Sequence, residues 1–198
     1  MRQDGVRARQ REQTRADLLR EGRRLFTAHG YAGVSLAEVV GAAGVTKGAL
    51  YHHFPGKTEL FRAVLADVQQ EVGARVAAEA STRDDLWEQL LAGCAEFLAA
   101  ALDPDVQRVL LVDGPAVLGW AEWRAMDAEA SGRHLSDALH ALLAAGVLAP
   151  QPVPPLVHLL SGAMNEAALW LAASPRPTDD LAVVRAALER MLGALRAA

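Results

Sequence analysis

The segment 35–61, which reads SLAEVVGAAGVTKGALYHHFPGKTELF, constrains the fold of this chain more than any other. Within it, Ser35 is followed three residues later by Glu38, a capping-box pattern that predicts a helix beginning at Leu36. Gly44 is expected to end this helix, because glycine enters the left-handed conformation of a helix end without steric cost. The segment is therefore expected to open with one short helix, and its residues predict both where this helix begins and where it ends.

A second short helix is expected directly after this glycine. Thr46 can cap it, and Leu50 and Phe54, four residues apart, give it an inner face. Two short helices joined across a glycine turn form a helix-turn-helix, whose second helix enters the major groove of DNA with its first residues toward the bases. The sequence therefore predicts a helix-turn-helix at residues 35–54.

This region resembles the DNA-binding domain of the TetR family of one-component transcriptional regulators. The resemblance extends from Thr14 to about Leu65 and rests on TRADLL, LFTAHGYAGVSLAEV, AGVTKGALYHHF and GKTEL, which follow one another in register. It implies that the helix at residues 46–54 reads the major groove. It also implies that Tyr51 binds a phosphate and that Lys57 touches a phosphate from the next helix.

The outward side chains distinguish a reading helix from a helix that only packs. With Leu50 and Phe54 facing inward, the residues left outside are small near the helix start, where the backbone must approach DNA closely. Lys47 can reach guanine or a phosphate, and Tyr51 and His52 can donate to phosphates or bases. The residues expected to contact DNA are Ser35, Thr46, Lys47, Gly48, Ala49, Tyr51, His52 and Lys57.

The charge of the chain is divided unevenly. A uniform net charge of −4 would argue against a nucleic-acid partner. Residues 1–62, however, hold eleven Lys and Arg against six Asp and Glu, a net +5, whereas residues 63–198 hold nine against eighteen, a net −9. A basic head approaches phosphate and an acidic body keeps the molecule soluble. We therefore expect a DNA-binding domain at 1–62 and a second domain at 63–198.

Composition favours an all-α fold. Alanine, leucine and arginine dominate, β-branched residues are scarce, and a hydrophobic content of 52% over 198 residues suffices for a buried core. We expect about nine helices, divided between an N-terminal three-helix domain that carries the helix-turn-helix and a C-terminal helical domain for ligand binding and dimerisation. Beyond the helix-turn-helix, the expected helices cover residues 10–29, 60–72, 84–102, a short stretch from 103, 114–146, 155–173 and 178–196.

Three of these expectations concern helix boundaries. Residues 2–11 carry four arginines and no apolar periodicity, which predicts a disordered arm, with an arm that contacts phosphates or the minor groove as the alternative. The stretch 114–146 is expected to be one long helix ended by Gly146. Thr178 is expected to cap the last helix.

Several classes of protein are disfavoured. The single cysteine, Cys94, lies on an apolar stripe, excludes an internal disulfide and suits a cytoplasmic protein. The first twenty residues lack the apolar core of a signal peptide, and prolines interrupt the longest uncharged run, 138–165, so no membrane span is expected. We expect no cofactor and no metal.

No catalytic motif is visible. The sequence GKT at 56–58 resembles the end of a phosphate-binding P-loop, but Tyr51 stands where the first glycine is required. His52 and His53, as neighbours on a helix, point about 100° apart and have no suitably spaced third metal ligand. The motif around Ser161 lacks the glycine two residues before the serine. We therefore do not expect an enzyme.

The aromatic residues of the body allow two interpretations. The stripe of Trp120, Trp123 and Met126 is either ordinary core or the wall of a ligand cavity, with His134 and Glu166 among the candidates for polar contacts. The family resemblance implies that the body binds a small molecule, which shifts the spacing of two DNA-binding heads and releases DNA. The candidate ligand-binding residues are Phe97, Asp113, Trp120, Trp123, Met126, Met164 and Asn165.

The C-terminal helices indicate how two chains would assemble. The helices at 155–173 and 178–196 carry wider apolar stripes than one body needs, and Gly162, Ala163 and Ala167 permit close approach. We expect a homodimer through these helices, bound to an inverted-repeat operator as a repressor that a small molecule releases. The alternatives are a DNA-binding activator, or a helical ligand-binding or enzymatic protein with a vestigial helix-turn-helix.

Overall fold

The computed structural model of this chain describes residues 2–197, with side chains from residue 5 onward. Within this part all regular elements are helices, apart from an isolated antiparallel bridge between Leu148 and Arg196. The all-α prediction is thus confirmed. In chain order the elements are α1 (Arg2–His29), α2 (Leu36–Ala43), α3 (Lys47–His53), α4 (Lys57–Ala80), α5 (Leu86–Ala100), the π-helix η1 (Val106–Asp113), α6 (Gly114–Leu118), α7 (Trp120–Ala128), α8 (Ser131–Ala144), α9 (Val153–Ala172) and α10 (Pro177–Gly193).

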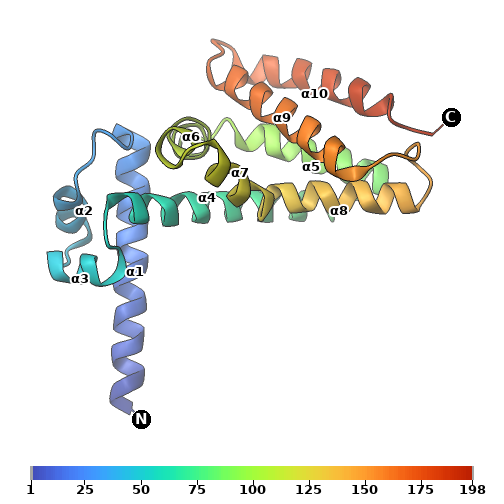
Figure 1. Cartoon of the computed structure of the whole chain (residues 1–198). Helices are drawn as coiled ribbons and strands as arrows, with labels where there is room; N and C mark the ends of the chain where they lie inside the picture. Colours follow the sequence, from blue (N-terminus) through green and yellow to red (C-terminus); the bar gives the residue numbers. More distant parts are fainter. Residues whose placement is uncertain (1, 198) are drawn as a thin grey trace.

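The helices form a small head and a larger body that share α4 (Figure 1). The head consists of α1, α2 and α3, with α2 and α3 on one side of α1. Helix α4 crosses α1 and continues into the body, where α5 and α8 pack against it and α9 and α10 form the outer layer. The predicted domain boundary between residues 62 and 63 lies inside this continuous helix. The head and the body are therefore joined by one uninterrupted helix.

The buried side chains of α4 join the two parts. Its first half buries Leu60, Phe61 and Val64, and its second half buries Val72 and Val76. In the head, the ring of Phe61 lies edge-on to those of Phe26 and Tyr31, with centroid separations of 5.3 and 5.2 Å. Apolar burial supplies most of the driving force for folding. One continuous core therefore extends from the head through α4 into the body.

The expectation of a disordered arm at residues 2–11 is wrong. Helix α1 begins at Arg2 and runs without a break to His29, where Gly30 ends it with a φ of 68°. Residues 5–13 are all exposed, so apolar periodicity could not reveal these turns. They consist largely of residues that favour helix, and contacts between residues four apart support them, as where Arg9 Nε donates to the Gly5 carbonyl over 3.2 Å.

The long helix predicted at 114–146 is three helices instead. Gly119 adopts a φ of 81°, which only glycine tolerates well, and this residue separates α6 from α7. The N–H groups of Glu129 and Ala130 turn back onto the carbonyls of Met126 and Asp127, which ends α7 before α8 begins. Apolar residues keep a helical spacing across both breaks, so the pattern alone could not show them.

The prediction that Thr178 caps the last helix is also wrong. Helix α10 begins one residue earlier, at Pro177, and its cap position is Arg176, which makes no side-chain capping bond. Proline suits a first helical position because it lacks the N–H group that would find no partner there. The carboxylate of Asp180, in the first turn of α10, accepts a hydrogen bond from the Ser174 side chain.

Candidate DNA-binding surface and cavity

The helix-turn-helix has the local geometry that the sequence predicts. The Ser35 hydroxyl accepts the Glu38 N–H over 3.3 Å, and the Ser35 N–H donates to Glu38 Oε2 over 2.7 Å, which completes the capping box. The Ser35 hydroxyl also donates to Glu38 Oε2 over 2.7 Å, and this bond, together with the one from the Ser35 N–H, lowers the pKa of Glu38. Gly44 ends α2 at a φ of 65°, and its N–H returns to the carbonyls of Val40 and Gly41. The turn is therefore fixed by backbone chemistry at both of its ends.

Helix α3 is fixed at its start and along one face. Thr46 caps it, since its Oγ1 accepts the N–H of Ala49 over 3.2 Å. Leu50 and Phe54 are buried in the head core, as predicted. The opposite face of α3 is consequently held in a defined orientation toward solvent.

Five of the eight residues predicted to contact DNA belong to α3. Lys47, Gly48, Tyr51 and His52 are exposed and Ala49 is half-buried. Tyr51, a large aromatic side chain, is 47% exposed, and the Lys47 ammonium lies 5.9 Å from its ring centroid. Nothing lies within 4 Å of the position that a Cβ on Gly48 would take, other than the Thr46 hydroxyl at 4.0 Å. The start of α3 therefore offers both polar groups and an open backbone.

Lys57 lies against Tyr31, a contact that the sequence analysis missed. It occupies the first position of α4, and its ammonium lies 4.2 Å from the ring centroid of Tyr31. The Tyr31 hydroxyl in turn shares a hydrogen bond of 2.9 Å with the Thr58 hydroxyl. Tyr31 follows the glycine that ends α1, 26 residues before Lys57, so only the folded head brings the two side chains together. This contact fixes where the Lys57 charge lies.

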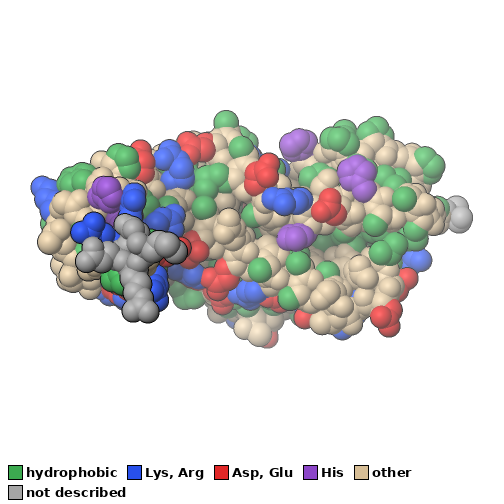
Figure 2. Space-filling model, turned by 90° about the horizontal axis from the view of Figure 1, so that it is seen from below, with side chains coloured by type: hydrophobic (Ala, Val, Ile, Leu, Met, Phe, Trp, Pro, Cys, Tyr) green, Lys and Arg blue, Asp and Glu red, His purple; other side chains and the backbone are tan. Residues whose placement is uncertain are grey.

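Further positive charge comes from Arg11 and Arg15 of α1, which lie near His53 of α3. Burial lowers the pKa of His53, and the neighbouring charges of His52, Arg11 and Arg15 lower it further. Arg15 also lies over the ring of Phe54, 5.7 Å from its centroid. In Figure 2, Lys and Arg side chains gather over the head at the left, whereas the rest of this face mixes both signs. The amino-terminal half of α1 thus extends the basic surface beside α3.

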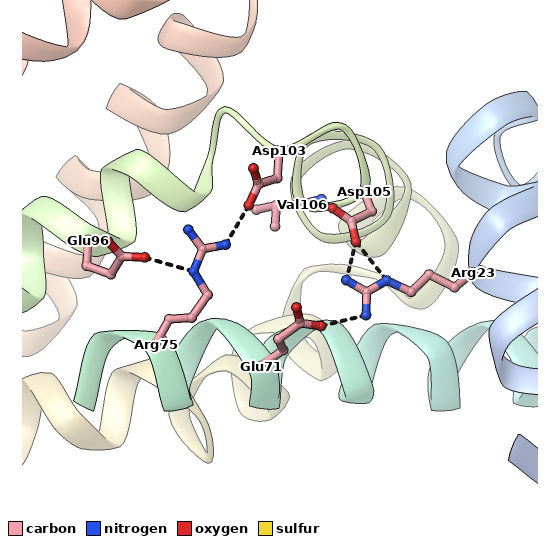
Figure 3. Close-up of polar contacts among 7 residues, drawn as sticks. All are labelled: Arg23, Glu71, Arg75, Glu96, Asp103, Asp105 and Val106. Atoms are coloured by element: carbon pink, nitrogen blue, oxygen red, sulfur yellow. Dashed lines mark hydrogen bonds and ion pairs between the residues drawn. The ribbon is translucent and has the colours of Figure 1, made fainter. Parts of the chain in front are cut away.

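A group of ion pairs connects the head to the body (Figure 3). Arg23 of α1 donates to Glu71 of α4 over 2.6 Å and to Asp105, in the segment between α5 and η1, over 2.7 Å. Arg75, one turn further along α4, donates to Glu96 of α5 over 2.8 Å and also to Asp103. The ion pairs therefore extend from α1, across α4, to the carboxyl end of α5.

A second connection between head and body involves Asp113, one of the candidate ligand residues. Its Oδ2 accepts the backbone N–H of Tyr31 over 2.7 Å and Arg108 Nε over 3.1 Å. Arg108 covers Gly30 so closely that a Cβ there would lie 1.8 Å from its Nη2. The Asp113 carboxylate is thus engaged in joining η1 to the end of α1.

The body contains a cavity of about 350 Å³ between α4, α5, α8 and α9. Its walls are mainly apolar, with Leu90 and Phe97 from α5, Leu135 from α8 and Met164 from α9. Cys94 also lies in the wall, where burial raises the pKa of its thiol to about 12. A cavity of this size and character is typical of small-molecule sites.

The structure places only part of the predicted ligand set in this cavity. Phe97, Met164 and His134 line it, whereas Asp113, Asn165 and Glu166 do not. The stripe on α7 lies outside it as well: Trp120 is 64% exposed, Met126 is half-buried, and Trp123 is 2% exposed in the core, where its Nε1 donates to the Leu110 carbonyl over 2.9 Å. The break between α7 and α8 turns this stripe away from the cavity.

One end of the cavity is polar, which the sequence analysis missed. Ser131 and Ser161 line it there, and behind them lie Asp127, which is 5% exposed, and Arg124. Ser131 Oγ donates to Asp127 Oδ1 over 2.8 Å, and Arg124 Nη1 donates to Asp127 Oδ2 over 3.0 Å and to Ser161 Oγ over 2.8 Å. These residues come from α7, α8 and α9, so no local pattern could reveal the cluster.

The outer faces of α9 and α10 are unusually apolar. Leu159 is 71% exposed and Trp170 is 51% exposed on α9, and Val183 and Met191 are more than half exposed on α10. Large apolar side chains that gather on one surface often mark an interface.

Among the described residues, no helix is both long and apolar enough to cross a membrane, and no cluster of His, Cys, Asp or Glu is arranged to hold a metal ion.

A capped helix-turn-helix with an exposed polar second helix, set on a larger helical body, defines a class of DNA-binding transcriptional regulators. Two family models match the chain. The model described as bacterial regulatory proteins of the tetR family matches residues 18–64, and the one described as the Tetracyclin repressor-like C-terminal domain matches residues 87–195, more than half of the chain. The chain belongs to the TetR family of DNA-binding transcriptional regulators.

Individual relatives agree with this assignment. A TetR-family regulator from Pectobacterium atrosepticum is 36% identical, with a TM-score of 0.79 over 96% of this chain and 97% of that one. The regulator CymR from Pseudomonas putida is 42% identical over 79 residues, which are 38% of this chain and only 37% of CymR. The structure of RolR in complex with its ligand resorcinol has the same fold, at 22% identity and a TM-score of 0.72, over 93% of this chain and 89% of RolR. Because the family is one of non-enzymatic DNA-binding regulators, an enzymatic role has no support.

Proposed function

We propose that this chain acts as a homodimeric repressor that binds an inverted-repeat operator and leaves it when a small molecule enters the body cavity. The observation that carries the proposal is the fixed, outward orientation of the α3 face that bears Lys47, Tyr51 and His52. A helix that only packed would not need such a face. Because operators are part of the chromosome, this role also implies a cytoplasmic location.

In the proposed complex, the start of α3 enters the major groove. Gly48 and Ala49 allow the backbone to approach the base edges, Lys47 reaches guanine or a phosphate, and Tyr51 and His52 donate to bases or phosphates. Ser35 and Thr46 fix the starts of the two helices beside the DNA backbone. Lys57, held against Tyr31, contributes a phosphate contact from α4.

The proposed dimer forms through α9 and α10. The exposed apolar side chains of both helices would be covered by the same surface of a second chain, as a twofold axis requires. Gly162, which is exposed, and the half-buried Ala163 and Ala167 allow the α9 helices to pack closely. Four helices, two from each chain, would then form a bundle that sets the distance between the two heads.

The proposed release works through α4. Val76 and Ala77 line the cavity near one end of this helix, and Lys57 lies at its other end. A ligand that favours a different tilt of α4 would change the spacing of the two heads. Binding can shift this equilibrium only if the ligand prefers the released conformation, so an inducer must bind free protein more tightly than DNA-bound protein. RolR, a protein of the same fold, is known in complex with a small ligand, resorcinol.

A reporter experiment separates a repressor from an activator. The operator, once selected from random DNA, is placed between a constitutive promoter and a reporter gene, with and without the chain. A repressor lowers expression, and the Tyr51→Ala variant restores it. Expression that rises when the chain is present would overturn the repressor proposal in favour of the activator alternative. A gel shift with the same operator then tests release by candidate ligands.

A further inference from the structure

The hydrogen bonds at the polar end of the cavity have a fixed direction. An ionised carboxylate only accepts and a guanidinium only donates, whereas a hydroxyl has one proton and two lone pairs. Ser131 therefore gives its proton to Asp127, over 2.8 Å. Ser161 accepts from Arg124 over 2.8 Å, and its proton points to Asp127 over 3.4 Å.

These assignments determine what the two serines offer to a ligand. Ser131 keeps its lone pairs, and Ser161 keeps the lone pair that Arg124 does not use. Since both hydroxyls line the cavity and both protons are engaged with Asp127, these two serines accept hydrogen bonds from a ligand rather than donating them. A ligand group placed against them must donate.

The charges around the cavity act against anions. Among the described residues that line it there is no Lys or Arg, the imidazole of His134 is the one basic side chain, and the acidic Asp137 lies at its wall. The start of α8 also belongs to the wall, and helix starts attract anions. There, however, the buried Asp127 carboxylate already lies against Ser131 at the helix start. Asp127 and Arg124 neutralise each other over 3.0 Å, so Arg124 offers no free positive charge to a ligand.

Most of the remaining wall is apolar. Leu90, Phe97, Leu135 and Met164 supply aliphatic and aromatic surface, and the Cys94 thiol stays uncharged because burial raises its pKa. A volume of about 350 Å³ accommodates two fused rings. The polar end and the apolar wall thus make different demands on one ligand.

Building on the release function proposed above, we infer that the cavity takes an uncharged, mainly apolar molecule whose hydroxyl group donates a hydrogen bond to Ser131 or Ser161. The hydroxyl lies at the serine end and the apolar skeleton lies against Phe97 and Leu90. The class includes phenols and similar alcohols and excludes carboxylates of the same skeleton. A site that hydrogen-bonds a hydroxyl discriminates strongly against analogues that lack it.

Four probes with one skeleton test this inference on the full chain by isothermal titration calorimetry near pH 7. They are 2-naphthol, naphthalene, 2-methoxynaphthalene, which cannot donate, and 2-naphthoate, which is an anion. We expect 2-naphthol to bind roughly tenfold or more tightly than naphthalene and 2-methoxynaphthalene, as a lost hydrogen bond implies, and 2-naphthoate to bind most weakly. Equal affinity for naphthol and its methyl ether, preference for naphthoate, or no binding of any probe would overturn the inference.

Serine variants locate the binding group. Ser131→Ala and Ser161→Ala should reduce the preference for 2-naphthol over 2-methoxynaphthalene, whereas Ser136→Ala, on the same α8 but outside the cavity, should leave it unchanged. Thermal melts check that each variant folds. If the cavity variants unfold, the four-probe series on the unaltered chain decides alone.

A gel shift run with the same probes separates this inference from the proposed function. Selective binding of 2-naphthol without release of operator DNA would leave the ligand class standing and contradict the proposed release. If the probes release DNA, but 2-naphthol does so no better than the probes without a hydroxyl donor, the proposed release stands and the inferred ligand class is overturned.

Discussion

Arg23 Nε donates to Asp105 Oδ2 over 2.7 Å, which joins the long helix of the DNA-binding head to the segment that follows the cavity helix α5. The two residues are 82 positions apart in the chain. Arg75 ties the same region to α4 through Glu96 and Asp103. The region that follows α5 is thus linked to the head in two ways, through α4 and directly to α1.

A double-mutant cycle measures the direct route. Asp105→Asn removes the charge but keeps an oxygen that can accept the Val106 N–H, which Asp105 Oδ1 accepts over 3.0 Å. Because the pair is only partly buried, Arg23→Gln and Asp105→Asn should show a coupling of about 1 kcal/mol in the free energy of unfolding. A parallel cycle on Arg20 and Asp17, an exposed pair within α1, should give less. Additive effects at Arg23 and Asp105 would mean that they do not act together.

The salt dependence of DNA binding tests the role of Lys57. Each phosphate contact releases counterions, so Lys57→Ala should weaken binding to all sequences and reduce the slope of log affinity against log salt by roughly one unit. Arg83→Ala removes an exposed positive charge from the body, outside the proposed dimer helices, and serves as the control. Titrations at several salt concentrations measure the slopes. If both variants keep the slope of the unaltered chain, Lys57 makes no phosphate contact.

Charges placed on α9 test the proposed dimer. In one chain Leu159 is exposed and Ala163 is half-buried on the outer face, so an arginine there costs a monomer little. In a dimer the same arginine would be buried without a partner, and Leu159→Arg and Ala163→Arg should cause dissociation. Val112→Arg, at an exposed apolar residue of η1, is the matched control. Sedimentation that shows stable dimers in both α9 variants would place the interface elsewhere.

Trp123 should behave as a core residue. It is buried, and Gly114 packs so closely against it that a Cβ there would lie 2.8 Å from Trp123 Cδ1. Trp123→Ala removes a large buried ring and the hydrogen bond to Leu110, so we expect a loss of about 3–5 kcal/mol in the free energy of unfolding. Trp120→Ala, at the exposed neighbour, should cost far less. Denaturant titration measures both, and a stable Trp123→Ala variant would contradict this assignment to the core.

The head is predictable from sequence because its signals are local. The capping box at Ser35, the glycine at Gly44 and the cap at Thr46 each act within four residues, and the observed geometry follows them. That the body consists of helices is also predictable, because its apolar residues recur at helical spacing. The exposed first turns of α1 carry no such spacing, and the prediction of disorder failed there.

The breaks and the cavity depend on tertiary structure. Gly119 interrupts an apolar pattern that continues across it. The pattern alone therefore predicts that Trp120 and Trp123 share one helix with Leu135. The polar end of the cavity brings together Asp127 and Ser161, which are 34 residues apart. Such contacts form only when the helices pack, and no spacing rule anticipates them.

Selection of operators from random double-stranded DNA tests the central claim most directly. A dimer presents two identical α3 helices to one face of the duplex, so the enriched sequences should form an inverted repeat whose half-sites lie about 34–36 Å or a multiple of that apart. The Tyr51→Ala variant, run in parallel, should enrich the repeat weakly. Recovery of no common sequence by the unaltered chain, or of a single site without symmetry, would contradict a dimer that reads DNA through α3.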